Sequence, residues 1–204
     1  MPKQYVRKYF IMGSQDCSRN PEDILAEAIH GGITAFQYRE KGVGALKGDK
    51  KIALAKTLRS LCKKHDIPFF INDDVELIEM LQVDGVHVGQ SDTPVHLLRK
   101  KYPHIQIGLS VSNVEELKNS PIHLVDYVGA GPIYPTTSKI DAKQTVGLEW
   151  IKTLRERYPD LAIVGIGGIQ LTNAKDVLHA GADGVAVISA ITKANDIDKI
   201  VKTL

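Results

Sequence analysis

Apolar and polar positions along the chain follow two alternating patterns. Short apolar runs, such as residues 69–71, stop abruptly at polar or glycine residues, which is typical of buried strands. Between these runs, apolar residues recur at helical spacing, as at Leu54, Leu58, Leu61 and Cys62. The first pattern predicts strands over residues 9–13, 35–40, 69–72, 85–89, 106–111, 126–131, 162–166 and 185–189. The second predicts helices over residues 21–31, 50–65, 75–81, 94–102, 114–118, 148–158, 172–180 and 196–202.

Proline, asparagine and glycine mark several of the predicted helix ends. Asn20 is expected to cap the first helix, with Pro21 in its first position. Thr93 and Pro94 predict the same kind of start for the fourth helix. A glycine pair, which begins at Gly31, is expected to end the first helix.

The order of these elements predicts the fold. Strict alternation of strand and helix favours a parallel sheet with right-handed crossovers, and eight units suggest closure into a (β/α)8 TIM barrel. The tripeptide that begins at Asp84 recurs at Asp183, an offset of 183 − 84 = 99 residues, as two half-barrels would give. No linker divides the chain, so residues 1–204 are expected to form a single catalytic domain. The alternative is an open doubly wound sheet, but residues 165–168 do not extend to a dinucleotide-binding fingerprint.

Composition narrows the class of protein. The formal net charge of +2 over 204 residues gives no reason to expect nucleic acid or an anionic membrane as a partner. Two cysteines, Cys17 and Cys62, are too few for a disulfide framework. The first residues do not resemble a signal peptide, and no apolar run approaches the roughly 20 residues of a membrane span. A cytoplasmic location is therefore expected, and a homo-oligomer is left open.

Polar side chains gather at the ends of the second, third and fourth predicted strands. Gln37, Arg39 and Lys41 alternate along one strand and therefore share a face, which fits only the carboxyl mouth of a parallel barrel. There the two cations could bind anionic oxygens. The alternative is a strand that ends early in a solvated loop. Asp73 and Asp92 follow neighbouring strands and suit a Mg²⁺ ion whose coordination shell is completed by substrate phosphates. The alternative is that each lies at a helix start, in or beside the capping position.

Two further segments suit phosphate binding. The loop over residues 132–147 carries hydroxyl groups and Lys139, which could fold onto a phosphate. The alternative is that this segment is a flexible surface loop. Glycines over residues 165–168 and the strand end at Ile188 and Ser189 resemble the phosphate cradle common in barrels. Ser110 ends the fifth strand as a candidate hydrogen-bonding or proton-handling group. His87 lies within a strand and is interpreted as an interior histidine rather than a catalyst.

Five segments together resemble the thiamine phosphate synthase family, nearly along the whole chain. They are Gln37-Tyr38-Arg39-Glu40-Lys41, Ile71-Asn72-Asp73, Asp84-Gly85-Val86-His87-Val88-Gly89-Gln90-Ser91-Asp92, Gly131-Pro132-Ile133-Tyr134-Pro135-Thr136-Thr137-Ser138-Lys139 and Gly165-Ile166-Gly167-Gly168-Ile169. The resemblance implies a (β/α)8 barrel that joins hydroxymethylpyrimidine diphosphate to a thiazole phosphate and releases pyrophosphate. Tyr38 and Ser91 depart from the residues common in the family.

The resemblance also implies roles for individual residues, with Mg²⁺ as the cofactor and two small molecules as the substrates. It implies a metal site at Asp73 and Asp92, and catalytic roles for Arg39, Lys41, Ser110 and Lys139. The implied pyrimidine diphosphate site contains Gln37, Tyr38, Arg39, Glu40, Lys41, Asn72, Ser110 and Lys139. The implied thiazole phosphate site contains Thr136, Thr137, Ser138, Gly168, Ile188 and Ser189.

Three other functions remain open on the sequence. A related thiazole tautomerase would not need the aspartate pair. A non-catalytic protein that binds thiamine precursors would bind both ligands without forming product. A phosphosugar isomerase would need an acid/base pair that faces a sugar carbon, and the sequence offers no such pair.

Overall fold

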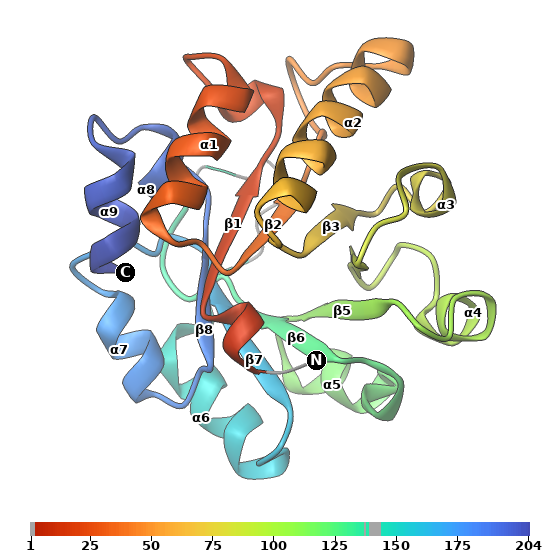
Figure 1. Ribbon diagram of the computed structural model, residues 1–204. Helices are drawn as coiled ribbons and strands as arrows, with labels where there is room; N and C mark the ends of the chain where they lie inside the picture. Colours follow the sequence, from red (N-terminus) through yellow and green to blue (C-terminus); the bar gives the residue numbers. More distant parts are fainter. Residues whose placement is uncertain (1–2, 137, 139–143) are drawn as a thin grey trace.

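The computed structural model describes residues 3–136, 138 and 144–204. Its eight strands are parallel and form a closed barrel in chain order, and the last strand pairs with the first. Helices surround the strands (Figure 1). The predicted (β/α)8 barrel is therefore confirmed, and the open doubly wound sheet is excluded. The strands are β1 (Lys8–Met12), β2 (Ala35–Tyr38), β3 (Phe69–Asn72), β4 (Gly85–Val88), β5 (Gln106–Val111), β6 (Tyr127–Ala130), β7 (Ala162–Ile166) and β8 (Gly184–Val187).

The helices follow the predicted order with shifted ends. Asn20 caps the first helix and accepts a hydrogen bond from the Glu22 N–H, as predicted. The start predicted for the fourth helix is wrong, because Pro94 itself occupies the capping position and no side chain caps the helix. The helices are α1 (Pro21–Gly31), α2 (Gly48–Lys64), α3 (Leu77–Leu81), α4 (Val95–Lys101), α5 (Val114–Asn119), α6 (Gly147–Arg157), α7 (Ala174–His179), α8 (Ser189–Thr192) and α9 (Ile197–Thr203), with 3-10 turns η1 (Lys3–Val6), η2 (Ser14–Asp16) and η3 (Ile122–Leu124).

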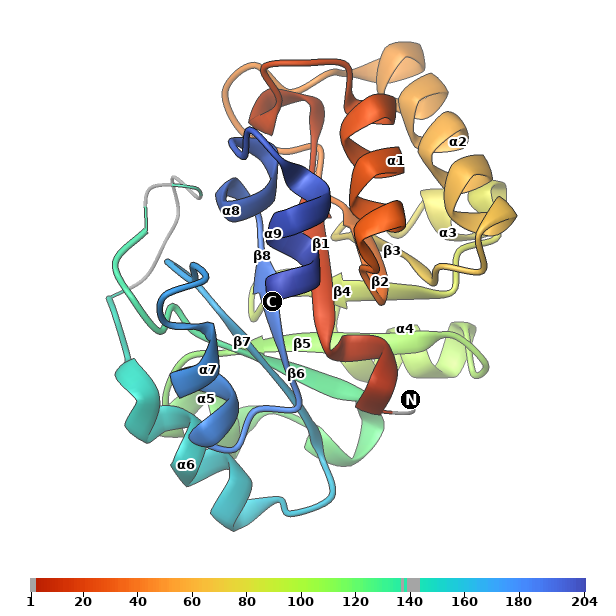
Figure 2. The same ribbon diagram turned by 60° about the vertical axis from the view of Figure 1, so that its left-hand side comes forward.

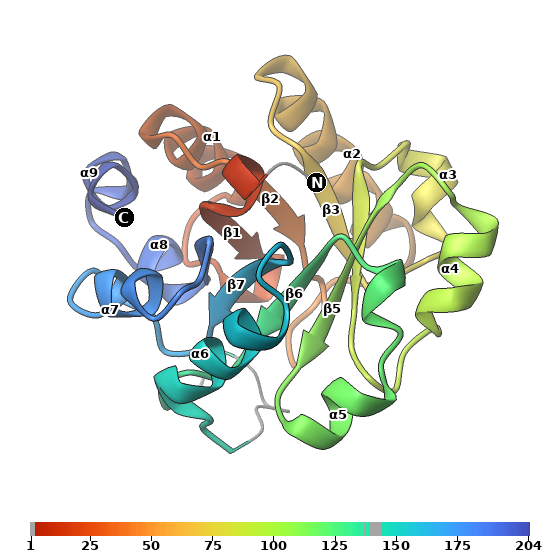
Figure 3. The same cartoon turned by 90° about the horizontal axis from the view of Figure 1, so that it is seen from below.

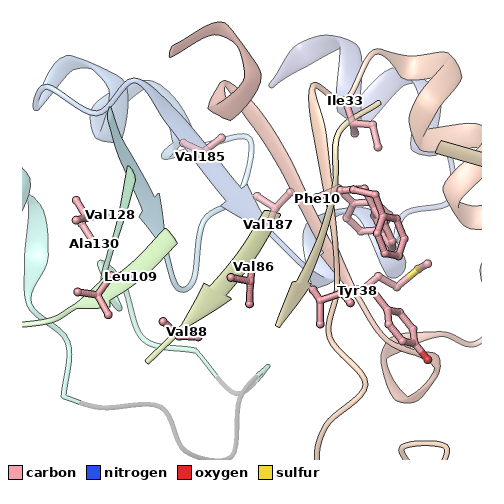
Figure 4. Close-up of a cluster of buried hydrophobic side chains, with 14 of the residues drawn as sticks. Phe10, Ile33, Tyr38, Val86, Val88, Leu109, Val128, Ala130, Val185 and Val187 are labelled. Atoms are coloured by element: carbon pink, nitrogen blue, oxygen red, sulfur yellow. The ribbon is translucent and has the colours of Figure 1, made fainter. Parts of the chain in front are cut away.

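The two faces of each strand belong to two separate cores. Outward-facing residues such as Phe10, Val86 and Leu109 pack against the helices (Figure 4). Inward-facing residues fill the barrel, where the rings of Tyr9, Phe70 and Tyr127 meet edge to face. Because side chains alternate along a strand, one apolar run supplies both cores. This explains why the strands read as continuous hydrophobic stretches.

The amino end of the barrel is closed by the start of the chain. Val6, the last residue of η1, is buried in the interior core, and Figure 3 shows η1 in front of β1. On the outside, the first and last helices lie side by side (Figure 2), and Val201 of α9 packs against Gly31 of α1. The ends of the chain therefore help to close the ring of helices.

Three arginine–aspartate pairs join the outer helices to the amino ends of the strands. Asp84, Asp126 and Asp183 each precede a strand, and each accepts a hydrogen bond from a backbone N–H of the preceding strand. Each aspartate also pairs with an arginine from a helix, namely Arg59, Arg99 and Arg155. The sequence repeat at Asp84 and Asp183 thus marks an arginine–aspartate pair that occurs three times, at Asp84, Asp126 and Asp183. It lies at the end of the barrel that serves stability.

No helix in the described part of the chain is long and apolar enough to cross a membrane.

Candidate active site at the carboxyl mouth of the barrel

A cavity of about 460 Å³ lies at the carboxyl mouth of the barrel, where ligands bind in this fold. One side of its wall is polar and carries Lys41, Asp92 and Ser110. The other side is formed by the loop after β6, the glycines after β7 and the start of α8. Five residues predicted for the thiazole phosphate line this cavity: Thr136, Ser138, Gly168, Ile188 and Ser189.

A second cavity, of about 780 Å³, lies on the β1, β2 and β8 side of the mouth. Arg39 lines it, and Lys41 lines both cavities. The hydroxyls of Ser138 and Ser189 also face both and are hydrogen-bonded to each other at 3.3 Å. The two compartments therefore meet at Lys41, at Ile188 and at this pair of serines.

Strand β2 ends at Tyr38, two residues before the predicted end, so of the three predicted alternating residues only Gln37 lies within the strand, and Arg39 and Lys41 lie in the loop that follows it. Gln37 faces the barrel interior and donates a hydrogen bond to the Tyr9 hydroxyl, while Lys41 reaches the mouth. Arg39 is buried, at 6% exposed, yet it lines the second cavity. A cation held in such a place interacts more strongly with an anion than one in open water does.

The two predicted metal ligands lie together. Asp73 and Asp92 are within hydrogen-bonding distance of each other, and Lys41 Nζ lies 2.6 Å from Asp73 Oδ2. Burial raises the pKa of Asp73, and the neighbouring Asp92 raises it further against the opposing effect of Lys41. Burial would also raise the pKa of Asp92, but hydrogen bonds from Asp73 and from the Gly89 N–H lower it overall. Two carboxyl groups at this separation disfavour simultaneous ionisation, which a cation between them would relieve.

The backbone holds both aspartates in place. Asp73 has φ of 62°, a left-handed conformation, and its N–H donates to the His87 carbonyl at 3.0 Å. Asp92 Oδ2 accepts a hydrogen bond from the Gly89 N–H at 2.7 Å and so closes the turn after β4. Within the described residues, no group of three or more His, Cys, Asp or Glu side chains forms a metal site. A metal at this pair would need further ligands from substrate or water.

Tyr38 and Glu40 point away from the ligand space. The Tyr38 hydroxyl donates to the Lys51 carbonyl in α2, on the outer face of the barrel. Glu40 is 5% exposed and accepts hydrogen bonds from the Ser14 N–H, the Ser14 hydroxyl and the Leu46 N–H. Neither is among the described residues that line the two cavities. Their side chains support the loops that carry Arg39 and Lys41.

The glycines after β7 are shaped by the loop after β6. Gly167 and Gly168 have positive φ of 97° and 62°, and a Cβ at Gly168 would lie 2.4 Å from the Pro135 carbonyl oxygen. The Tyr134 N–H donates to the Gly167 carbonyl and fixes the base of that loop against the turn. Only glycine fits this backbone without rearrangement.

Three other predicted residues complete the comparison with the sequence. Ser110 lies at the mouth and is hydrogen-bonded to His87 at 2.8 Å, which confirms His87 as an interior residue. Asn72 ends β3 and is 7% exposed. Thr137 and Lys139 lie outside the described residues, so their predicted roles stay predictions.

Comparison with known proteins decides the family. The family described as thiamine monophosphate synthase matches residues 8–191. The chain belongs to the thiamine monophosphate synthase family. Its sequence is 54% identical to the thiamine-phosphate synthase of Oceanobacillus iheyensis, over 99% of this chain and 98% of that protein. It is 50% identical to the thiamine-phosphate synthase of Anoxybacillus flavithermus, over 100% of this chain and 94% of that one.

A solved structure supports membership of the thiamine monophosphate synthase family. Thiamine phosphate pyrophosphorylase from Pyrococcus furiosus superimposes with a TM-score of 0.86 at 32% sequence identity. The match covers 99% of this chain and 95% of that one. The resemblance recognised in the sequence is therefore confirmed at the level of the family.

Sequence reasoning missed several residues around the site of this family member. Tyr9 and Tyr127 join Gln37 to His87 through hydrogen bonds inside the barrel. Their signal in the sequence is weak, because a tyrosine in a buried strand looks like any other aromatic core residue. Ser14 and Gln15 hold the segment 39–40 but lie in a short turn with no periodic pattern. Helix α8 was missed because four residues are too few to show helical periodicity.

Proposed function

We propose that this protein condenses 4-amino-2-methyl-5-hydroxymethylpyrimidine diphosphate with 4-methyl-5-(2-hydroxyethyl)thiazole phosphate, or its carboxylated form, to give thiamine monophosphate and pyrophosphate. The observation that carries the proposal is the meeting of Asp73, Asp92 and Lys41 at a mouth that also holds a glycine cradle. Membership of the thiamine monophosphate synthase family supports it. Residues 1–204 would act as one catalytic domain.

The diphosphate would lie on the cationic side of the mouth. Arg39 offers a planar pair of donors, and Lys41 a mobile point charge shared by the two cavities. Gln37, predicted for the same site, is 1% exposed and lines neither cavity, so its side chain would support the site from the barrel interior. Asn72, at the end of β3, would add a polar contact, and Lys139 is predicted to join it. These cations would stabilise the negative charge that develops on pyrophosphate as it leaves.

The aspartate pair would hold Mg²⁺. The residues fit this ion, since it prefers hard oxygen ligands and the two carboxyl groups lie close enough to interact directly. When bound, the ion would neutralise charge on the diphosphate and so assist its departure. Lys41 would then be shared between Asp73 and the diphosphate oxygens.

The thiazole phosphate would lie across the mouth. Gly168 and Ser189 would supply donors without adding charge, and Thr136 and Ser138 would close over the phosphate. Ile188 and Thr137 are predicted members of the same site. A neutral cradle here and cations opposite would keep the two phosphorylated substrates from exchanging places.

The reaction needs positioning more than proton transfer. The C–O bond to the diphosphate breaks with its electron pair on oxygen, and the aminopyrimidine ring donates electron density to the methylene carbon. The thiazole nitrogen lone pair then forms the C–N bond. Holding both rings in one cavity makes this attack effectively unimolecular.

The direct test is thiamine phosphate formation from the two precursors, with and without Mg²⁺. The wild type is expected to form product only with the metal, and Asp92→Ala to lose at least about 100-fold in kcat/KM. Asp160→Asn, an exposed change in the turn before β7, serves as the control and should leave the rate unchanged.

Other outcomes would favour the rival functions. Binding of both precursors without product would indicate a non-catalytic binding protein. Rearrangement of a thiazole phosphate without any metal requirement would indicate a tautomerase. Either result would contradict the proposed synthase activity.

A further inference from the structure

A chain of four hydrogen bonds crosses the barrel interior and ends at the mouth. The Gln37 amide donates to the Tyr9 hydroxyl at 3.0 Å, and Tyr9 is bonded to the Tyr127 hydroxyl at 2.8 Å. The Tyr127 hydroxyl is bonded to His87 Nδ1 at 3.1 Å, and His87 Nε2 to Ser110 Oγ at 2.8 Å. Only the last residue, Ser110, lines the cavity among these five in the described part of the chain.

The number of protons available along this row of hydrogen bonds decides which residue donates in each of them. Burial raises the pKa of both tyrosines, so each hydroxyl keeps its single proton. Tyr9 accepts from Gln37 and can therefore donate to Tyr127, which in turn donates to His87 Nδ1. His87 then carries its proton on Nε2 and donates it to Ser110. The Ser110 proton is left to point into the cavity.

The opposite direction is less favourable. If Ser110 donated to His87 and each bond were reversed, the proton of Tyr9 would have no acceptor in a residue that is 1% exposed. Turning the Gln37 amide over would instead leave its nitrogen buried without an acceptor, whereas in the present orientation that nitrogen donates to Tyr9 and the amide atom without a partner is the carbonyl oxygen. Orphaned buried donors are rarer than undersatisfied carbonyl oxygens.

Two glycines make room for this chain. A Cβ at Gly108 would lie 2.1 Å from the Tyr127 ring and 2.5 Å from His87 Nδ1. A Cβ at Gly129 would lie 3.1 Å from His87 Cε1. The rings of His87 and Tyr127 are 5.5 Å apart between centroids, and a side chain at Gly108 would displace one or both of them.

We propose that Tyr9, Tyr127 and His87 are positioning residues that make Ser110 a hydrogen-bond donor to the pyrimidine diphosphate. The ligand must then present an acceptor to Ser110, either a ring nitrogen or a diphosphate oxygen. This inference rests on the proposed function, because it assigns a direction to a contact within the same site. It predicts that the tyrosines act on the substrate only through Ser110.

A double-mutant cycle tests this dependence. Tyr127→Phe is expected to raise the KM for the pyrimidine diphosphate about 5- to 20-fold, with the KM for the thiazole phosphate unchanged. In a Ser110→Ala background the same change should have almost no further effect. Additive effects of the two substitutions would overturn the inference. If Tyr127→Phe is poorly folded, Tyr9→Phe can replace it in the double-mutant cycle. Tyr102→Phe, at the end of α4, is the matched control.

Nitrogen NMR of the ligand-free wild type gives a second, independent readout. The His87 signal, assigned by its loss in His87→Gln, is expected to show a protonated Nε2 and an unprotonated Nδ1. In Tyr127→Phe this tautomer preference should weaken. A wild-type His87 that carries its proton on Nδ1, or on both nitrogens, at pH 7.5 would overturn the inference even if the enzyme is active. Absence of product formation by the wild type would instead contradict the proposed function.

Binding of two probes identifies the acceptor atom. If Ser110 donates to the ring, Ser110→Ala should weaken binding of the pyrimidine alcohol and leave pyrophosphate binding unchanged. If it donates to the diphosphate, the reverse is expected. Unchanged binding of both probes would overturn the assignment of Ser110 as a donor.

Discussion

Ser14 and Glu40 are hydrogen-bonded through Ser14 Oγ and Glu40 Oε1 at 2.5 Å, and this contact joins the loop after β1 to the loop after β2. The Ser14 N–H and the Leu46 N–H also donate to the same carboxylate. Gln15 donates to the Arg39 carbonyl from the same turn. The segment that presents Arg39 and Lys41 is therefore held by η2 from one side and by the Leu46 N–H from the other.

Weakening this contact should affect one substrate more than the other. In Glu40→Gln the charge is lost and one acceptor becomes a donor, so the loop with Arg39 loses its fixed position. We expect the KM for the pyrimidine diphosphate to rise about 5-fold or more, and the KM for the thiazole phosphate to change less than 2-fold. Steady-state kinetics with each substrate varied in turn would check this. Equal increases in both constants would contradict it.

Asp73 combines a left-handed backbone with a predicted metal contact, and two substitutions separate these properties. Asparagine tolerates the left-handed region, so Asp73→Asn should keep its stability within about 0.5 kcal/mol. Asp73→Ala should lose about 1–2 kcal/mol from backbone strain. Both should lose Mg²⁺-dependent activity. Urea unfolding and the product assay would check this. A fully active Asp73→Asn variant would show that Asp73 is not a metal ligand.

The Arg99–Asp126 pair should matter for stability and not for substrate binding. Asp126 Oδ2 accepts from Arg99 Nη2 and from the Ile107 N–H, and both side chains are mostly shielded from water. Asp126→Ala should cost about 1–3 kcal/mol, because the Ile107 N–H loses its acceptor and Arg99 loses its carboxylate, keeping only carbonyl acceptors such as that of Leu124. Glu149→Gln, which breaks an exposed pair with Lys152, should change stability by less than about 0.5 kcal/mol. Similar losses in both variants would contradict the distinction.

Gly168→Ala should weaken the thiazole phosphate site. The new methyl group would meet the Pro135 carbonyl oxygen at 2.4 Å, so the turn after β7 would have to move. We expect the KM for the thiazole phosphate to rise about 10-fold or more, since the cradle depends on the position of backbone donors. Gly32→Ala is the matched control, because Gly32 also has positive φ but would meet nothing within 4 Å. It should cost about 1 kcal/mol in stability and leave both KM values unchanged.

Neither cysteine should react readily in the folded protein. Burial raises the pKa of the Cys62 thiol to about 12, and burial together with nearby Asp16 and Glu40 raises that of Cys17 to about 12. A raised thiol pKa reduces the thiolate, so at pH 8 only on the order of one thiol in ten thousand is ionised. Iodoacetamide at pH 8 should therefore label neither residue within minutes, and mass spectrometry should find both labelled in urea. Rapid labelling of the native protein would contradict this.

The sequence by itself determined the fold and the family. Short continuous apolar runs with helical stripes between them predicted eight strand–helix pairs, because each strand must bury both of its faces in a barrel. Asn20, Pro21 and the glycine pair at residue 31 predicted the limits of α1, since capping is a local property of the backbone. The two cations after β2 were likewise predicted to reach the mouth, and Arg39 and Lys41 do line its cavities, whereas Gln37, predicted to join them, faces the barrel interior.

Tertiary structure alone decided which polar groups meet. The hydrogen-bonding distance between Asp73 and Asp92 depends on the closure of β3 against β4, and no local pattern encodes it. The outward direction of Tyr38 and the burial of Glu40 follow from packing against α2 and η2, so a motif alone did not reveal their supporting role. The chain from Gln37 to Ser110 joins residues from strands that are distant in sequence. Such contacts arise because a closed barrel brings every inward-facing side chain to one axis.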